Sequence, residues 1–107
     1  MAERYEVKVA VDKPVFELYS YLSDVSLALG MRVEVVFGRQ KLLGVVKGIL
    51  PYDPSLPRKY KLKRISGVVD EEPAYSEKLL ELSDFLSHYY IHPIGEVLKS
   101  MLPGGSK

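Results

Sequence analysis

Cysteine is absent from this 107-residue sequence, which also lacks tryptophan, asparagine and threonine and contains a single glutamine, Gln40. Without cysteine, the chain has no disulfides, no thiol catalysis and no cysteine-ligated zinc or iron–sulfur site. A scarcity of thermolabile amides beside many Glu and Lys residues is typical of thermophile proteins. These absences limit the chemistry and indicate a heat-loving source, but they point to no activity.

Long apolar runs are missing as well. The N-terminal residues MAERYEVKVAV are interrupted by charge, so we expect no secretory signal. No apolar run approaches the length of about 20 residues that a membrane-spanning helix requires. We therefore expect a cytoplasmic protein with no membrane partner. The length predicts one domain over 1–107, with a β-rich part over 1–72 and a helical part over 73–107.

Enzyme signatures are also lacking. The sequence has neither a GxxxxGK[ST] phosphate loop nor GxGxxG, and no serine lies in an elbow motif. His88 and His92 have the spacing of zinc ligands on a helix, but the acidic residue of HExxH is missing and Pro93 follows. Surface or capping roles are favoured for both histidines. We expect no catalytic residue, no cofactor and no metal, and hence a domain that is not an enzyme.

The stretch 30–49 predicts a β-hairpin. Val33, Val35 and Phe37 alternate with other residues, and a second run rich in β-branched residues follows. Between the runs, Gly38-Arg39-Gln40-Lys41 is a turn signal, since glycine accepts the positive φ that tight connections need. The turn carries two cations.

Three other segments favour strands. Residues 4–11 and 64–69 read as strands, while 16–22 permits either a short helix or a strand. The aromatic alternation of 16–22 favours a strand with Tyr19 and Tyr21 on one face. After Leu50, a loop rich in proline and basic residues is expected.

From Ser76 onward the apolar residues recur at the spacing of a helix. Ser76 is a candidate N-cap, and Pro93 begins a second helix that Pro103-Gly104-Gly105 stops. The first helix is expected to have an apolar face of Leu79, Leu82, Leu86 and Tyr89, and the second a face of Ile94, Val97, Leu98 and Met101. The predicted fold class is α+β, a small barrel-like antiparallel sheet of about five strands followed by a C-terminal helical hairpin.

Charge is concentrated in the middle of the chain. Residues 39–64 carry eight basic groups and one acidic group, whereas both flanks are net negative. Such a cationic segment fits an anionic partner, or a solvated loop whose lysines protect strand edges. Tyr19, Tyr21 and Tyr60 adjoin these cations, as single-stranded nucleic-acid binding requires, although tyrosines in strands are commonly core residues.

Six motifs occur in an order that resembles a known family. They run from Val9 to Pro103: VAV, YSYL, GMRVEVVFGRQK, GVV, LKRISGVVDEEP and YYIHPIGEVLKSMLP. The sequence is similar to the N-terminal domain of PriA, the primosomal replication-restart helicase. The resemblance implies a DNA-binding domain for the 3′ terminal nucleotide, with its free 3′-hydroxyl, of the nascent leading strand at stalled forks.

The resemblance also implies a binding pocket. Its residues, with the cation at the hairpin tip, are Tyr19, Ser20, Tyr21, Gly38, Arg39 and Lys63. Ser20 stands where the family usually has Asp, and Val36 stands where it has Pro. The implied partners are the 3′ end of DNA, the other domains of an ATP-dependent helicase, and primosome and single-strand-binding proteins.

Two alternatives remain open at this point. One is a small β-barrel adaptor that binds protein, with the basic segment as its solvated rim. The other is an RNA-binding module of translation, which would exploit the 2′-hydroxyl.

Overall fold

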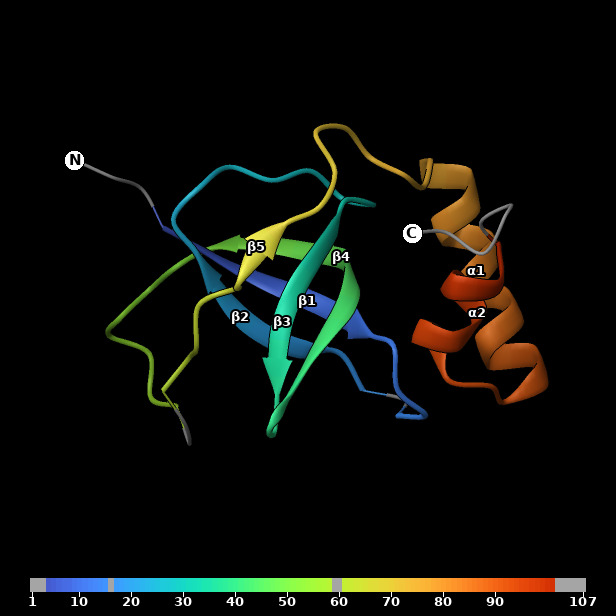
Figure 1. Cartoon of the computed structure of the whole chain (residues 1–107), viewed down its shortest axis with the longest axis horizontal. Helices are drawn as coiled ribbons and strands as arrows, with labels where there is room; N and C mark the ends of the chain where they lie inside the picture. The colour runs from blue at the N-terminus through green and yellow to red at the C-terminus, as the bar shows by residue number, and fades with distance from the viewer. Residues whose placement is uncertain (1–3, 16, 59–60, 102–107) are drawn as a thin grey trace.

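The computed structural model describes residues 4–15, 17–58 and 61–101, and it confirms an α+β fold in which two helices follow a five-stranded sheet (Figure 1). Phe16, Tyr60 and Pro103-Gly104-Gly105, on which predictions were made, lie outside the described residues. The strands are β1 (Tyr5–Val11), β2 (Tyr19–Ser23), β3 (Arg32–Phe37), β4 (Gln40–Pro51) and β5 (Gly67–Val68), and the helices are α1 (Glu77–Tyr90) and α2 (Ile94–Met101).

The sheet has the order β2-β1-β4-β3-β5, and every neighbouring pair is antiparallel. The predicted hairpin is confirmed: β3 and β4 pair from Arg32 opposite Val45 to Phe37 opposite Gln40. Gly38, in the connecting turn, has φ +64°, a left-handed conformation that costs glycine little. The tip of this hairpin lies at the lower edge of the molecule in Figure 1.

The predicted strand 64–69 is wrong in extent, because only β5 within it pairs as a strand. The residues before β5 instead lie beside β2, where Leu22 and Arg64 form an isolated parallel bridge. The N–H of Leu22 donates to the carbonyl of Lys63 at 2.8 Å, and the N–H of Ile65 donates to the carbonyl of Leu22 at 3.0 Å. The residues before β5 therefore pair with a single residue of β2, Leu22, and do not form a continuous strand.

The segment 63–69 then crosses to the other edge of the sheet. Ser66 donates its N–H to the carbonyl of Glu34 at 2.7 Å, and Val69 donates to that of Arg32 at 2.9 Å. The edge strand β2 and the strand β3 are therefore tied to the same short segment. Among the described residues the strand ladder nevertheless stays open, so the sheet is curved and barrel-like but not a closed barrel.

The central strands β1 and β4 are buried on both faces. Val9 and Val46 belong to one apolar core within the curve of the sheet, while their neighbours Ala10 and Val45 belong to a second core under the helices. Successive side chains of a strand point to opposite faces, so one pair of strands can serve both cores. The two helices lie together at one end of the sheet (Figure 1).

Helix α1 begins as predicted, with the Ser76 hydroxyl accepting a hydrogen bond from the N–H of Leu79 at 3.2 Å. The predicted apolar face is only partly right. Leu80 and Ser83 are buried instead, whereas Leu82 is 45% exposed and Tyr89 is 65% exposed. Apolar residues occur on several sides of this helix, so periodicity alone could not select the side that packs on the sheet.

Helix α2 buries Ile94, Val97 and Leu98, as predicted. Its Gly95 meets the backbone of β1 so closely that an added Cβ would lie 1.8 Å from the carbonyl oxygen of Val11. The Tyr75 hydroxyl donates to the carbonyl of Leu98 at 2.6 Å within the same core. The position of α2 therefore depends on the missing side chain at residue 95.

We predict that Gly95→Ala destabilises the domain by about 2 to 4 kcal/mol, because overpacking against a backbone carbonyl forces α2 away from β1. Urea denaturation followed by circular dichroism measures the loss. Gly67→Ala is the matched control, since nothing lies within 4 Å of a Cβ built at Gly67. Equal stability of both variants would contradict the close approach of α2.

Candidate nucleic-acid interface

One hollow lies between the start of β2, the tip of the β3–β4 hairpin and the segment that precedes β5. Its volume is about 490 Å³, within the range of about 300 to 1,000 Å³ that small-ligand sites occupy. It is large enough for a nucleotide. The residues that line it are Glu6, Tyr19, Ser20, Tyr21, Val36, Phe37, Gly38, Arg58, Lys61, Leu62 and Lys63.

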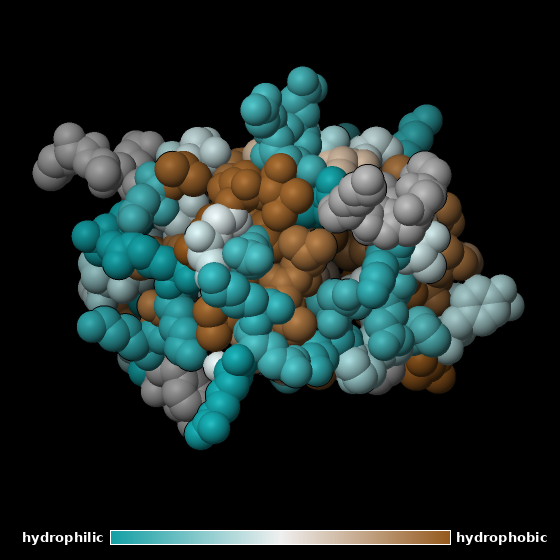
Figure 2. Space-filling model, in the orientation of Figure 1, coloured by the Kyte–Doolittle hydropathy of each residue, from teal (hydrophilic) through white to brown (hydrophobic). Residues whose placement is uncertain are grey.

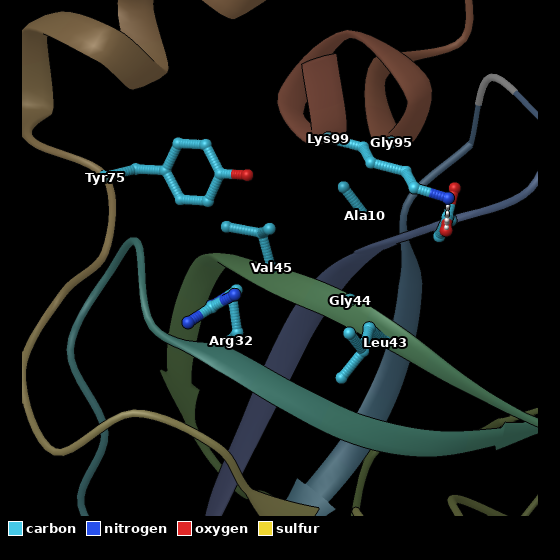
Figure 3. A pocket seen from close by; sticks show the side chains of 9 residues that line it. Ala10, Arg32, Leu43, Gly44, Val45, Tyr75, Gly95 and Lys99 are labelled. Carbon is cyan, nitrogen blue, oxygen red and sulfur yellow. Dashed lines mark ion pairs between the residues drawn. The ribbon is translucent and has the colours of Figure 1, made fainter. Parts of the chain in front are cut away.

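Two other hollows fit a polyanion less well. A cavity of about 40 Å³ between the sheet and α2, bordered by Arg32, Tyr75 and Lys99, has room for little more than water (Figure 3). A hollow of about 580 Å³ beside α1 is larger, but its one lysine, Lys47, is paired with Asp84 at 2.6 Å. Of these three hollows, the one beside the hairpin tip is both large enough for a nucleotide and net cationic.

The two tyrosines of β2 form an apolar wall of this hollow. Tyr21 is only 5% exposed, and its hydroxyl donates to the carbonyl of Val36 at 3.0 Å. Burial raises the pKa of Tyr21, so its hydroxyl stays protonated and remains a donor at neutral pH. Tyr19 is half-buried and meets Phe37 edge to face, with ring centroids 4.9 Å apart. Both tyrosines are therefore core residues that also border the hollow, and Tyr19 is the more accessible of the two.

Gly38 leaves the hairpin end of the hollow open. No heavy atom lies within 4 Å of the place where a Cβ at Gly38 would stand. A ligand can therefore approach the backbone there without displacing protein atoms. Arg39, the next residue, is exposed but does not line the hollow.

Three cations border the hollow from the loop side. Lys61 and Lys63 are exposed, and the backbone of Lys63 is anchored to Leu22 of β2. Arg58 is held more firmly, because its Nη1 donates to the carbonyl of Asp53 at 2.8 Å and its guanidinium lies 4.9 Å from the ring centre of Tyr52. In Figure 2, hydrophilic surface predominates at the lower left, where the loop after β4 lies.

The acidic residue of this site was not predicted from the sequence. Glu6 of β1 pairs with Arg58 at 2.8 Å and with Lys8 at 3.2 Å. Lys8 in turn donates to the hydroxyl of Ser20 at 2.7 Å, and the two residues are directly opposite in the β1–β2 register. Glu6 and Arg58 are 52 residues apart, so no local spacing could have revealed their contact.

The predicted site residues thus fall into two groups. Tyr19, Ser20, Tyr21, Gly38 and Lys63 line one hollow, whereas Arg39 stands outside it. Tyr60, which was expected beside them, lies outside the described residues.

The histidines lie elsewhere. His88 is in the last turn of α1, and the Nε2 of His92 is 3.4 Å from a carboxylate oxygen of Glu96. Over the described ranges, no three His, Asp or Glu side chains are grouped as a metal ion would require. Neither described helix has the length and apolar character needed to cross a bilayer.

Comparison with known proteins identifies the family of this chain. A family model for PriA, described as the 3′ DNA-binding domain, matches residues 8–103. The chain belongs to the PriA 3′ DNA-binding domain family. The match includes both the hollow's tyrosines and the lysines that face them.

Curated relatives carry the name replication restart protein PriA. The Haemophilus influenzae protein is 35% identical over 99 residues, which are 91% of this chain and 13% of that protein. Two Buchnera aphidicola proteins, from the subspecies Acyrthosiphon pisum and Schizaphis graminum, are 27% identical over 99 residues, again 91% of this chain and 13% and 14% of theirs. The chain thus spans about one eighth of the length of these relatives.

We predict that Glu6→Gln lowers the free energy of unfolding by about 1 to 2 kcal/mol at neutral pH, because Arg58 and Lys8 lose an ionised partner. The Arg58 guanidinium holds the pKa of Glu6 below its ordinary value near 4.5. A carboxylate with a lowered folded-state pKa contributes stability above its ordinary pKa and loses it as the pH falls through the folded value.

The difference in free energy of unfolding between wild type and Glu6→Gln should therefore become smaller in acid. Urea denaturation at neutral pH and at about pH 3, below the usual carboxyl range, measures it. A stability difference that is the same at both pH values would contradict the ionic role of Glu6.

Proposed function

We propose that this domain binds the 3′ terminal nucleotide of a DNA strand in the hollow beside Gly38. The observation that carries the proposal is that five of the six predicted site residues, from three separate stretches of the sequence, line one hollow with three cations at its rim. Membership in a 3′ DNA-binding domain family supports DNA as the partner.

The chemistry of the hollow suits a strand end. A base can stack on the accessible ring of Tyr19, and stacking is tolerant of base identity because every base has a π-face. The phosphate that precedes the terminal sugar meets Lys61 and Lys63, which hold it without reading sequence. Next to Gly38, the absence of a side chain lets the sugar reach the main chain. Binding should therefore depend on the terminus and not on its sequence.

The expected salt dependence is shallow. The described cations at the hollow, Arg58, Lys61 and Lys63, would contact about two or three phosphates. At about −0.7 per phosphate for single strands, the slope of log affinity against log salt would be near −1.4 to −2.1. Affinity for an isolated strand should be modest.

The larger setting of this activity is also part of the proposal. In a replication-restart helicase, the domain would hold the 3′ end of the nascent leading strand at a stalled fork while other domains carry the ATPase. Those domains, together with primosome and single-strand-binding proteins, are the expected protein partners. The domain itself binds and performs no catalysis.

The test is a fluorescence anisotropy titration with two oligonucleotides of one sequence, ending in a 3′-hydroxyl or a 3′-phosphate. A hydroxyl both donates and accepts hydrogen bonds, and losing that donor should weaken binding about tenfold. A 5′-phosphate on the same strand is the control and should have little effect. Equal affinity for both 3′ ends would contradict a terminal site.

The same titration separates the alternatives. An RNA strand of identical sequence should bind no better than DNA, because only an RNA reader gains from the 2′-hydroxyl. A protein adaptor would show weak binding to either strand that disappears at moderate salt and ignores the 3′ end.

Gly38→Ala tests the approach to the backbone. The change should cost about 1 to 2 kcal/mol of stability, because an L-residue is strained at φ +64°, but no neighbour lies within 4 Å to disturb the fold. We expect it to weaken binding of the 3′-hydroxyl strand about tenfold or more, since its methyl group occupies the space of the sugar.

Gly67→Ala is again the matched control, because Gly67 has equally open space and lies outside the hollow. It should leave affinity unchanged. If Gly38→Ala binds the strand as tightly as Gly67→Ala does, the sugar does not pack at Gly38.

A further inference from the structure

The hollow contains a negative charge that a simple phosphate-binding site would not need. Glu6 carries the one carboxylate among the described residues that line it, while Arg58, Lys61 and Lys63 are cationic. The side chain of Glu6 is only 12% exposed, so it is held in place and is not free to turn into solvent. A carboxylate at this position works against the attraction of the surrounding cations for any phosphate placed close to it.

Fixed partners hold Glu6 ionised. Its Oε1 accepts from Nη2 of Arg58 at 2.8 Å, and its Oε2 lies 3.2 Å from Nζ of Lys8. The Arg58 hydrogen bond is the largest cause of a pKa lowered below 4.5, and the Ser20 hydroxyl contributes to the same shift. At neutral pH the group is therefore an anion that accepts hydrogen bonds and donates none.

These partners leave Glu6 able to accept a further hydrogen bond. An ionised carboxylate has about four lone-pair sites, and Arg58 and Lys8 occupy two of them. A hydroxyl can donate to a remaining site. A phosphate at neutral pH has no comparable donor and brings about two negative charges close to the carboxylate.

We propose that Glu6 sets the preference of this hollow for a strand that ends in a hydroxyl over one that ends in a phosphate. The inference rests on the proposed function, because it assumes that the 3′ terminus enters the hollow. Glu6 accepts the hydrogen bond of the terminal hydroxyl and repels a terminal phosphate. It also neutralises Arg58 and Lys8, which without Glu6 would attract that phosphate. The remaining lysines, Lys61 and Lys63, serve the internal phosphates.

The test compares wild type, Glu6→Gln and Glu34→Gln in the two-oligonucleotide titration. Glu34→Gln removes the same charge from β3, and Glu34 does not line the hollow. The ratio of the two affinities within one protein preparation does not depend on the fraction of active protein. Circular dichroism of each variant checks the fold.

In wild type and Glu34→Gln, the 3′-hydroxyl strand should bind about ten times more tightly than the 3′-phosphate strand. In Glu6→Gln the ratio should fall to one or below, chiefly because the 3′-phosphate strand binds better. A Glu6→Gln variant that keeps the full preference would overturn the role of Glu6 while leaving the terminal site intact. If wild type itself shows no preference, the proposed function fails and this inference fails with it.

A second variant should change the preference for the 3′-hydroxyl strand in the opposite direction, and it does not remove a buried ion pair. Ser20 lines the hollow beside Lys8, so Ser20→Asp adds a second carboxylate there. It should increase the preference for the 3′-hydroxyl strand several-fold over wild type. If Glu6→Gln does not fold, an unchanged ratio in Ser20→Asp overturns the proposal.

Discussion

Two backbone hydrogen bonds at Leu22 hold together the parts of this domain on which its candidate site depends. They join β2, one edge of the sheet, to the carbonyl of Lys63 and the N–H of Ile65. Immediately afterwards the same segment bonds to Glu34 of β3, next to the opposite edge. These bonds place Lys63 beside β2, whose tyrosines line the same hollow. The hollow exists because one short segment satisfies polar backbone groups of both β2 and β3 in an open sheet.

The loop that precedes this segment brings opposite charges together. The chain has a net charge of only +1, but its cationic middle is folded against β1, where Glu6 meets Arg58. Arg58 also bonds to the carbonyl of Asp53 and lies against Tyr52, so it holds the proline-rich loop to the sheet. The result is a site with exposed lysines at its rim and a fixed anion inside. Such a mixed environment can distinguish chemical groups of a ligand, whereas a uniformly basic patch would only attract negative charge.

The packing of the helices on the sheet depends on a close backbone approach and on one buried hydrogen bond. Gly95 allows α2 to lie against β1, and Tyr75 ties the chain before α1 to the backbone of α2. This packing covers the second face of β1 and β4, which explains why their sequences are apolar at successive positions. The candidate DNA site lies away from the helices, and its lining residues come from the sheet and its loops. The helices therefore contribute to the stability of the domain and not to the lining of the candidate site.

Much of this arrangement could be predicted from local patterns, because hairpin, cap and turn signals act over a few residues. The β3–β4 hairpin, the Ser76 cap and the buried side of α2 were correctly predicted. A strand was correctly favoured over a helix within 16–22, although β2 spans Tyr19–Ser23. The extent of the strand at 64–69 was not, because its hydrogen bonds are divided between two distant partners. The buried side of α1 was predicted only in part, since its apolar residues surround the helix and only packing selects Leu80 and Ser83.

For the site, the sequence by itself determined the residue types: tyrosines, a turn glycine and a run of cations in a family-specific order. It could not determine that Arg39 stands outside the hollow, or that Glu6 stands within it against Arg58. Those placements depend on contacts between residues 52 positions apart, which arise only when β1 and the loop after β4 meet in the folded sheet. Local sequence encodes which groups are available, and the tertiary structure decides which of them share a site.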